Sequence, residues 1–177
     1  MDDHGPQAAF DLQPTLKGRL LELRPLTPED RDALFGAASD PLIWEQHPES
    51  NRHEPALFQR YFDGAIASGG AFAVIDAGSG RIIGSSRFCN LDPGREVEIG
   101  WTFLERAFWG GAYNREMKSL MLDHAFRFVD RAVFVVGEGN RRSQNALEKI
   151  GATKLRREER PGPDGTMAGC FVFVITR

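Results

Sequence analysis

The stretch from Glu98 to Met117 constrains the fold of this chain most. It reads as an apolar strand, a short loop, two adjacent glycines and the first turn of a long amphipathic helix. That order places the unpaired N–H groups of a helix start, with the positive end of the helix dipole, just beyond the end of a strand. Gly110 and Gly111 allow an anionic group to approach this backbone closely. The stretch therefore predicts an anion site, for which a pyrophosphate is the natural ligand.

The remaining patterns predict one mixed α/β domain, as the length of 177 residues also suggests. Residues 1–15 are expected to form a loose polar lead, and residues 16–177 the single domain. Because antiparallel hairpins precede the glycine loop and Gly-x-Gly-x-x-Gly is absent, a dinucleotide site is disfavoured. Strands are expected at 20–24, 71–76, 81–89, 96–103, 132–136, 153–160 and 167–175, and helices at 27–39, 55–68, 113–128 and 142–150.

Composition argues against several classes of partner. The formal net charge of −3 gives no global attraction to nucleic acid or to an anionic membrane. Cys89 and Cys170 lie in apolar strand-like runs without metal-ligand spacing, which indicates core thiols in a reducing compartment. No apolar run approaches the ~18 residues of a membrane span, and the polar N-terminus is unlike a signal peptide. We expect a cytoplasmic monomer or homodimer without a metal, nucleic-acid or membrane partner.

A second motif is more specific than the glycine loop. Asn140-Arg141-Arg142-Ser143 is followed by Leu147-Glu148-Lys149-Ile150-Gly151 at a helix end. With the strand, glycine loop and long helix before it, this segment makes residues 18–177 resemble the GCN5-related N-acetyltransferases. The branch that acetylates the amino termini of ribosomal proteins is the most similar. The resemblance implies a twisted, mixed but mostly antiparallel sheet of about six to seven strands, flanked by helices, with splayed strands that form an acetyl-CoA cleft.

The same resemblance implies a reaction and a co-substrate. Acetyl-CoA would give its acetyl group to a primary amine, either a peptide amino terminus or a small amine. Attack would be direct, within a ternary complex, because no cysteine stands where a covalent intermediate needs a nucleophile. Two alternatives stay open: a non-catalytic acyl-CoA sensor or complex subunit on the same fold, and a nucleotide-binding structural domain.

The resemblance also implies the residues that hold acetyl-CoA. The glycine loop would bind the pyrophosphate, although its residues differ from the usual family pattern at Trp109, Ala112 and Asn114. The strand edge would offer backbone groups, and the second motif would lie beside the pantetheine arm. The expected cofactor-binding residues are Phe103, Leu104, Trp109, Gly110, Gly111, Ala112, Tyr113, Asn114, Arg115, Asn140, Ser143 and Asn145.

Acetyl transfer also needs proton chemistry, since the amine must lose a proton and the departing thiolate must gain one. Glu98, on the strand that enters the cleft, is the candidate base, and a surface charge pair is its alternative role. The position of the tyrosine acid of many family members holds Leu147, so Ser143 is the candidate acid. A helix cap is the alternative role of Ser143.

The N-terminal half carries an aromatic set with two interpretations. Trp44, with Glu45 and His47, would line an acceptor site if the set had a substrate role. Aromatic residues at helical spacing usually belong to the core, and we favour that interpretation. The set consists of Phe35, Trp44, Phe58, Tyr61 and Phe62.

Overall fold

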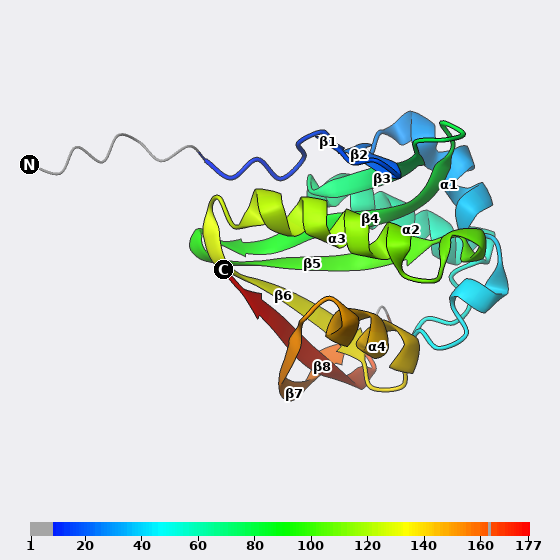
Figure 1. The fold of residues 1–177 in the computed structure, drawn as a ribbon. Helices are drawn as coiled ribbons and strands as arrows, with labels where there is room; N and C mark the ends of the chain where they lie inside the picture. Colours follow the sequence, from blue (N-terminus) through cyan, green and yellow to red (C-terminus); the bar gives the residue numbers. More distant parts are fainter. Residues whose placement is uncertain (1–8, 163) are drawn as a thin grey trace, which may run out of the picture.

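The computed structural model describes residues 9–162 and 164–177. This part of the chain forms one eight-stranded sheet with the strand order β1-β2-β3-β4-β5-β6-β8-β7 (Figure 1). The strands are β1 Leu16–Lys17, β2 Leu21–Pro25, β3 Ala71–Asp76, β4 Ile82–Asp92, β5 Gly94–Leu104, β6 Val129–Gly137, β7 Thr153–Pro161 and β8 Met167–Thr176. The α-helices are α1 Arg31–Ala38, α2 Pro55–Ser68, α3 Ala112–Ala125 and α4 Arg141–Lys149, with 3-10 turns at Pro28–Asp30, Pro41–Ile43 and Arg106–Phe108.

The predicted α/β class and the mixed, mostly antiparallel sheet are confirmed. The pair β5–β6 is parallel, and the other neighbouring pairs in the described sheet are antiparallel. The sheet has eight strands because it includes β1. This strand has two residues and is too short to show a periodic sequence pattern. Among the described helices, none is both long and apolar enough to cross a membrane.

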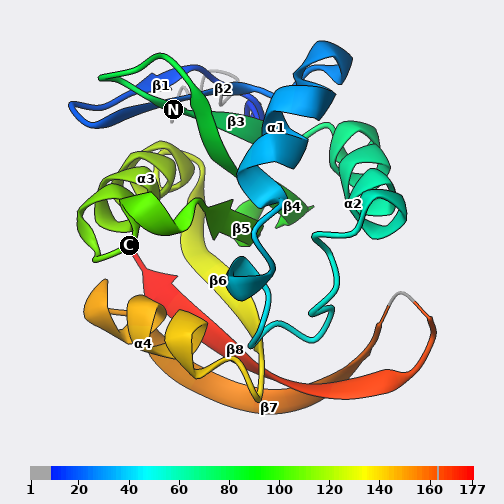
Figure 2. The ribbon, with the colours of Figure 1, turned by 90° about the vertical axis from the view of Figure 1, so that its right-hand side faces the viewer.

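Helices cover both faces of the sheet, with α3 and α4 on one side and α1 and α2 on the other (Figure 2). The alternation along β3 supplies both faces from one strand. Phe72 and Val74 pack into the core beneath α3, while Ala71 and Ala73 pack into the core beneath α1 and α2. The sheet is therefore the middle layer of three, with one hydrophobic core on each of its faces.

The strands β5 and β6 separate halfway along their length. Their parallel pairing runs from Gly94 opposite Val129 to Glu98 opposite Val133 and ends there. Beyond that point β5 has a positive φ of 50° at Trp101, and its register with β4 shifts. A bulge of this kind bends a strand away from its neighbour. The two strand ends therefore diverge and leave backbone groups on their facing edges without a ladder partner.

The segment before β1 is held against the sheet. The Phe10 ring packs edge-on against Phe88 at 5.3 Å and lies 5.1 Å from Phe128, and His124 Nε2 is 2.7 Å from the Asp11 carbonyl oxygen. Residues 1–15 were expected to be a loose polar segment. Residues 9–15 instead pack against the core on the α3 side, through the apolar side chains of Phe10 and Leu12. Residues 1–8 of that segment lie outside the described residues.

Candidate functional site

A cavity of about 620 Å³ lies where β5 and β6 diverge. Its walls come from five parts of the chain: the strand end 99–104, the glycine loop with the first turns of α3, the end of β6, the start of α4, and the segment before α2. The diverging ends of β5 and β6 and the N-terminal ends of α3 and α4 thus line the same cavity. A long, narrow ligand with both a polar and an apolar part fits such a site.

Most of the residues predicted to hold the cofactor line this cavity. They are Phe103, Leu104, Trp109, Gly110, Gly111, Asn114, Arg115, Asn140, Ser143 and Asn145. Ala112 and Tyr113 do not line it. The Tyr113 hydroxyl donates to Asp76 Oδ1 at 2.9 Å, and the ring packs edge-on against Phe108. Tyr113 therefore fastens the start of α3 to the end of β3.

The two glycines of the loop are required by backbone conformation. Gly110 and Gly111 have φ values of 108° and 107°, which L side chains rarely adopt. A Cβ atom on either glycine would meet nothing within 4 Å, so space is not the constraint. Gly111 is the N-cap of α3, and no side chain of the described residues caps the helix there. The first N–H groups of α3 are therefore available to a ligand.

The cavity is strongly positive. Among the described residues that line it there is no aspartate or glutamate. The cationic lining residues are Arg52, Arg115, Lys118, Arg141, Arg142 and Lys149. Glu49 partly neutralises Arg52 at 2.7 Å, and Glu45 approaches Arg142 at 3.3 Å. The site therefore suits a ligand with several negative charges, such as a phosphate chain.

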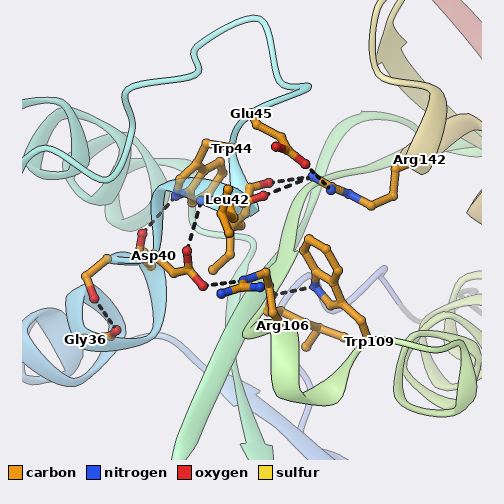
Figure 3. A network of polar contacts seen from close by, with 12 residues as sticks. Gly36, Asp40, Leu42, Trp44, Glu45, Arg106, Trp109 and Arg142 are labelled. Atoms are coloured by element: carbon orange, nitrogen blue, oxygen red, sulfur yellow. Dashed lines mark hydrogen bonds and ion pairs between the residues drawn. The ribbon is translucent and has the colours of Figure 1, made fainter.

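A stack of two side chains joins the glycine loop to α4. The Trp109 indole donates through Nε1 to the Leu104 carbonyl oxygen at 2.9 Å. The Arg142 guanidinium lies 4.2 Å from the centre of the Trp109 ring and donates to the Ile43 carbonyl oxygen at 3.0 Å (Figure 3). Trp109 and Arg142 thus connect the two helix starts on either side of the cavity.

An ion pair holds the segment before α2 against the same loop. Arg106 donates to Asp40, whose other carboxylate oxygen accepts from the Leu42 N–H at 3.0 Å (Figure 3). The Arg106 guanidinium is the main cause of a lowered pKa at the Asp40 carboxyl. The Trp44 indole donates to the Ala38 carbonyl oxygen at 2.8 Å. This segment therefore forms a fixed wall of the cavity.

The start of α4 settles which residue caps the helix. Asn140 Oδ1 accepts from the Ser143 N–H at 3.2 Å, so Asn140 is the N-cap. The capping role considered for Ser143 is wrong. Within the described part of the chain the Ser143 hydroxyl has no hydrogen-bond partner, and the residue lines the cavity. A hydroxyl placed in this way can donate to a ligand.

Glu98 lies next to the cavity but is not part of its lining. Its side chain is 5% exposed, and Oε2 accepts from Asn90 Nδ2 at 2.8 Å and from Arg160 Nη1 at 3.3 Å. The predicted charge pair thus exists, although its carboxylate is buried and its partner, the half-exposed Arg160, belongs to the C-terminal hairpin. Oε1 would lie 3.6 Å from a Cβ on Gly100, which does line the cavity. Oε1 is therefore the Glu98 oxygen that lies beside the cavity-lining Gly100.

Two lining residues have strongly lowered pKa values: Lys118, which had no role assigned from the sequence, and His47, which was considered only for an acceptor site. Lys118 on α3 is 4% exposed, and burial lowers its pKa to about 7. The signal for it was available, because Lys118 follows Asn114 by four residues and so shares its helix face. Burial and the nearby Arg52 lower the pKa of His47 to about 3, and His47 Nδ1 accepts the Glu49 N–H at 2.9 Å. His47 is therefore neutral and lacks a free lone pair on Nδ1.

The aromatic set of the N-terminal half is mostly core, as the sequence favoured. Phe58, Tyr61 and Phe62 are the buried aromatic residues of α2, and Phe35 of α1 packs against the same core. Trp44 is buried as well, yet it also lines the cavity. Three grouped metal-ligand side chains occur nowhere in residues 9–162 or 164–177, and both cysteines are free thiols.

Comparison with known proteins agrees with this architecture. Residues 20–153 match the family model described as Acetyltransferase (GNAT) domain. A GCN5-related N-acetyltransferase from Brucella melitensis superposes with a TM-score of 0.81 at 23% identity, over 97% of this chain and 80% of that chain. A probable GNAT-family acetyltransferase from Chromobacterium violaceum gives 0.83 at 19% identity, over 99% and 92%.

A third similar structure contains a ligand. Mycobacterium smegmatis RimJ in complex with CoA-disulfide superposes with a TM-score of 0.67 at 21% identity, over 92% of this chain and 86% of that chain. No curated protein sequence matches the chain. At these identities the structural likeness concerns the fold.

Proposed function

Since the chain belongs to the GCN5-related N-acetyltransferase (GNAT) family, we propose that it transfers the acetyl group of acetyl-CoA to a primary amine. The observation that carries the proposal is the cavity at the fork of β5 and β6, which has six cationic lining residues and no described carboxylate. Acetyl-CoA carries a pyrophosphate and a 3′-phosphate on a long pantetheine arm. A positive hollow with free strand edges matches both parts.

The lining suggests a place for each part of the co-substrate. The pyrophosphate would lie at Gly110 and Gly111, against the first N–H groups of α3, with Arg115 near its charge. The Leu104 carbonyl oxygen already accepts from Trp109, so the pantetheine amides would pair with the other backbone groups on the β5 edge that faces the fork. They would also pair with the Asn140 amide nitrogen, because Asn140 Oδ1 is occupied by the cap. The thioester would then lie in the fork itself.

The acceptor amine would attack the thioester directly. Burial raises the pKa of the Cys89 thiol to about 12, and neither cysteine lines the cavity, so no thiolate is placed to form a covalent intermediate. Glu98 Oε1 would take the proton of the amine, directly or through water. Ser143 would donate a hydrogen bond to the departing sulfur. The acceptor class is a peptide amino terminus or a small amine.

A non-catalytic acyl-CoA sensor is the second candidate. It is favoured by the ion pair that engages the buried Glu98 carboxylate with Arg160 and by the apolar Leu147 on the cavity wall. A sensor would bind acetyl-CoA in the same cavity without consuming it. Binding therefore tests both candidates, and turnover separates them.

Thermal unfolding in the presence of acetyl-CoA, free CoA or ATP tests occupation of the cavity. At 100 times its Kd, a ligand of the native state adds about 2.7 kcal/mol to the free energy of unfolding. For a chain of this size the Tm should rise by about 5–10 °C with either coenzyme. ATP lacks the pantetheine arm and should give no comparable rise. A flat response to acetyl-CoA would exclude both candidates.

Replacing Ser143 with alanine should lower kcat about 10- to 100-fold, because a hydrogen bond to a charged sulfur contributes about 1.5–3 kcal/mol. The Kd for acetyl-CoA should change less than about twofold, which equilibrium titration measures. Ser119→Ala, on the exposed face of α3, is the matched control. An unchanged kcat in Ser143→Ala would remove Ser143 from the reaction.

A further inference from the structure

The cavity lacks an obvious source for the proton that the thiolate must gain. Among the described residues that line it there is no aspartate, glutamate, tyrosine or cysteine. His47 is neutral with its Nδ1 lone pair occupied, and arginine does not release its proton. Lys149 is exposed near the end of α4. Lys118 is therefore the one buried lining group that can exchange a proton near neutral pH.

The position of Lys118 agrees with such a role. Its Nζ donates to Thr102 Oγ1 on β5 at 2.7 Å and lies 5.7 Å from the centre of the Phe134 ring on β6. Both contacts come after Glu98 and Val133, the last paired residues of these strands. The amine therefore lies in the fork between the strand ends, where the proposed function puts the thioester.

A hydroxyl pair keeps Lys118 hydrogen-bonded in both of its protonation states. Thr102 Oγ1 is 2.8 Å from Ser86 Oγ, and either atom can donate. When Lys118 is an ammonium, it donates to Thr102, and Thr102 donates to Ser86. When Lys118 is neutral, both hydroxyl protons can turn round, so that Thr102 donates to Nζ. The site thus accommodates loss of the proton while keeping the hydrogen bond between Lys118 and Thr102.

We propose that Lys118 is a catalytic residue that protonates the CoA thiolate as the thioester breaks; this inference rests on the proposed function. The amine nitrogen forms a bond to the acetyl carbon, and the C–S bond breaks with its electron pair on sulfur. The proton moves from Lys118 Nζ to that sulfur, and the proton of the attacking amine goes to Glu98 or water. Solvent then restores the ammonium. The products are an N-acetyl amide and CoA thiol.

The charges around Lys118 favour this direction of transfer. A thiol has an ordinary pKa of about 8.5, so an ammonium with a pKa of about 7 gives its proton to the thiolate readily. Burial is the cause of that low pKa. Thr102, Ser86 and Phe134 face Lys118 from β5, β4 and β6, and none of them titrates near neutral pH. The charged residues of the same cavity are Arg115 on α3, Arg52 before α2, and Arg141, Arg142 and Lys149 on α4, all of them cations.

The pH dependence of kcat tests the proposal with Lys118→Met, Lys118→Arg and the exposed control Lys154→Met. The wild type should lose kcat above about pH 7, where Lys118 becomes neutral. Lys118→Met should have a kcat at least about 100-fold below that of the wild type, and its pH profile should lack the alkaline limb. Its Kd for acetyl-CoA should stay within about threefold of the wild-type value. Lys118→Arg should be as slow as Lys118→Met, since a guanidinium keeps its proton. Lys154→Met should behave as the wild type.

Three results would overturn the assignment: a wild-type kcat in Lys118→Met, recovery of kcat in Lys118→Arg, or loss of the acidic limb in place of the alkaline one. Recovery in Lys118→Arg would mean that only the positive charge matters. Circular dichroism and a melting curve establish that each variant is folded. If the wild type itself shows no amine-dependent turnover, the proposed function fails; if the wild type and Lys118→Met are equally active, only this inference fails.

Discussion

Gly111→Val is expected to weaken acetyl-CoA binding about 10- to 100-fold. Gly111 has a φ of 107° at the N-cap of α3, and a β-branched residue in such a conformation costs about 1–3 kcal/mol. A Cβ there meets nothing within 4 Å, so a clash is not the reason. The backbone relieves its strain by rotating, which turns the first N–H groups of α3 away from the phosphates. A change of 1.4 kcal/mol in binding free energy is tenfold in Kd.

The control for Gly111→Val is Gly165→Val in the β7–β8 hairpin. Gly165 also has a positive φ, of 82°, and its Cβ would meet nothing within 4 Å. Both variants should lose similar folding stability, while only Gly111→Val should lose affinity in equilibrium titration with acetyl-CoA. Equal affinities in the two variants would show that the glycine loop does not hold the pyrophosphate.

Lys118→Met is expected to stabilise the fold without ligand by about 2–4 kcal/mol at pH 6–7. Burial lowers the pKa of Lys118 from 10.5 to about 7, so the folded state disfavours the ammonium that the unfolded chain carries. At about 1.36 kcal/mol per pKa unit, this cost has an upper bound of about 5 kcal/mol. The expected gain is smaller because methionine cannot replace the hydrogen bond that Lys118 donates to Thr102 Oγ1. The Tm should rise by about 5–10 °C.

The pH dependence of this gain follows from proton binding. Below pH 7 both states of the wild type hold the proton, so the full cost of the buried ammonium is present. Between pH 7 and about 10.5 the unfolded chain binds more protons, and the stability of the wild type rises with pH. The difference from Lys118→Met should therefore shrink over that interval, and above it only the loss of the hydrogen bond to Thr102 should remain. A difference that is constant from pH 6 to pH 10 would contradict a lowered pKa at Lys118.

Local patterns predicted most of the secondary structure. The apolar stripe of α3, the turn between β3 and β4 and the closing hairpin each depend on residues that are close in sequence. The helix expected at 113–128 ends at Ala125, since β6 already begins at Val129. Most of the cofactor-binding residues expected from the resemblance line one cavity. The glycine loop and the Asn140 motif made them recognisable, because each motif is a local pattern at a helix start.

Contacts between segments that are distant in the chain could not be predicted from the sequence. Glu98 pairs with Arg160, which lies 62 residues further along the chain and comes close only through the long β7–β8 hairpin. Lys118 received no role from the sequence, because its burial depends on contacts with β5 and β6 where these strands diverge. Ala112 and Tyr113 were assigned to the cofactor with the rest of their loop, but Tyr113 bonds to Asp76 on another strand.

Acetyl transfer itself is the central claim, and a screen of amine acceptors measures it directly. Acetyl-CoA is mixed with the protein and with peptides or small primary amines, while free CoA thiol is quantified and the acceptor is weighed by mass spectrometry. We expect thiol release that depends on the amine and matches the acetylated acceptor mole for mole. Stabilisation by acetyl-CoA without any amine-dependent thiol release would contradict catalysis and leave the acyl-CoA sensor.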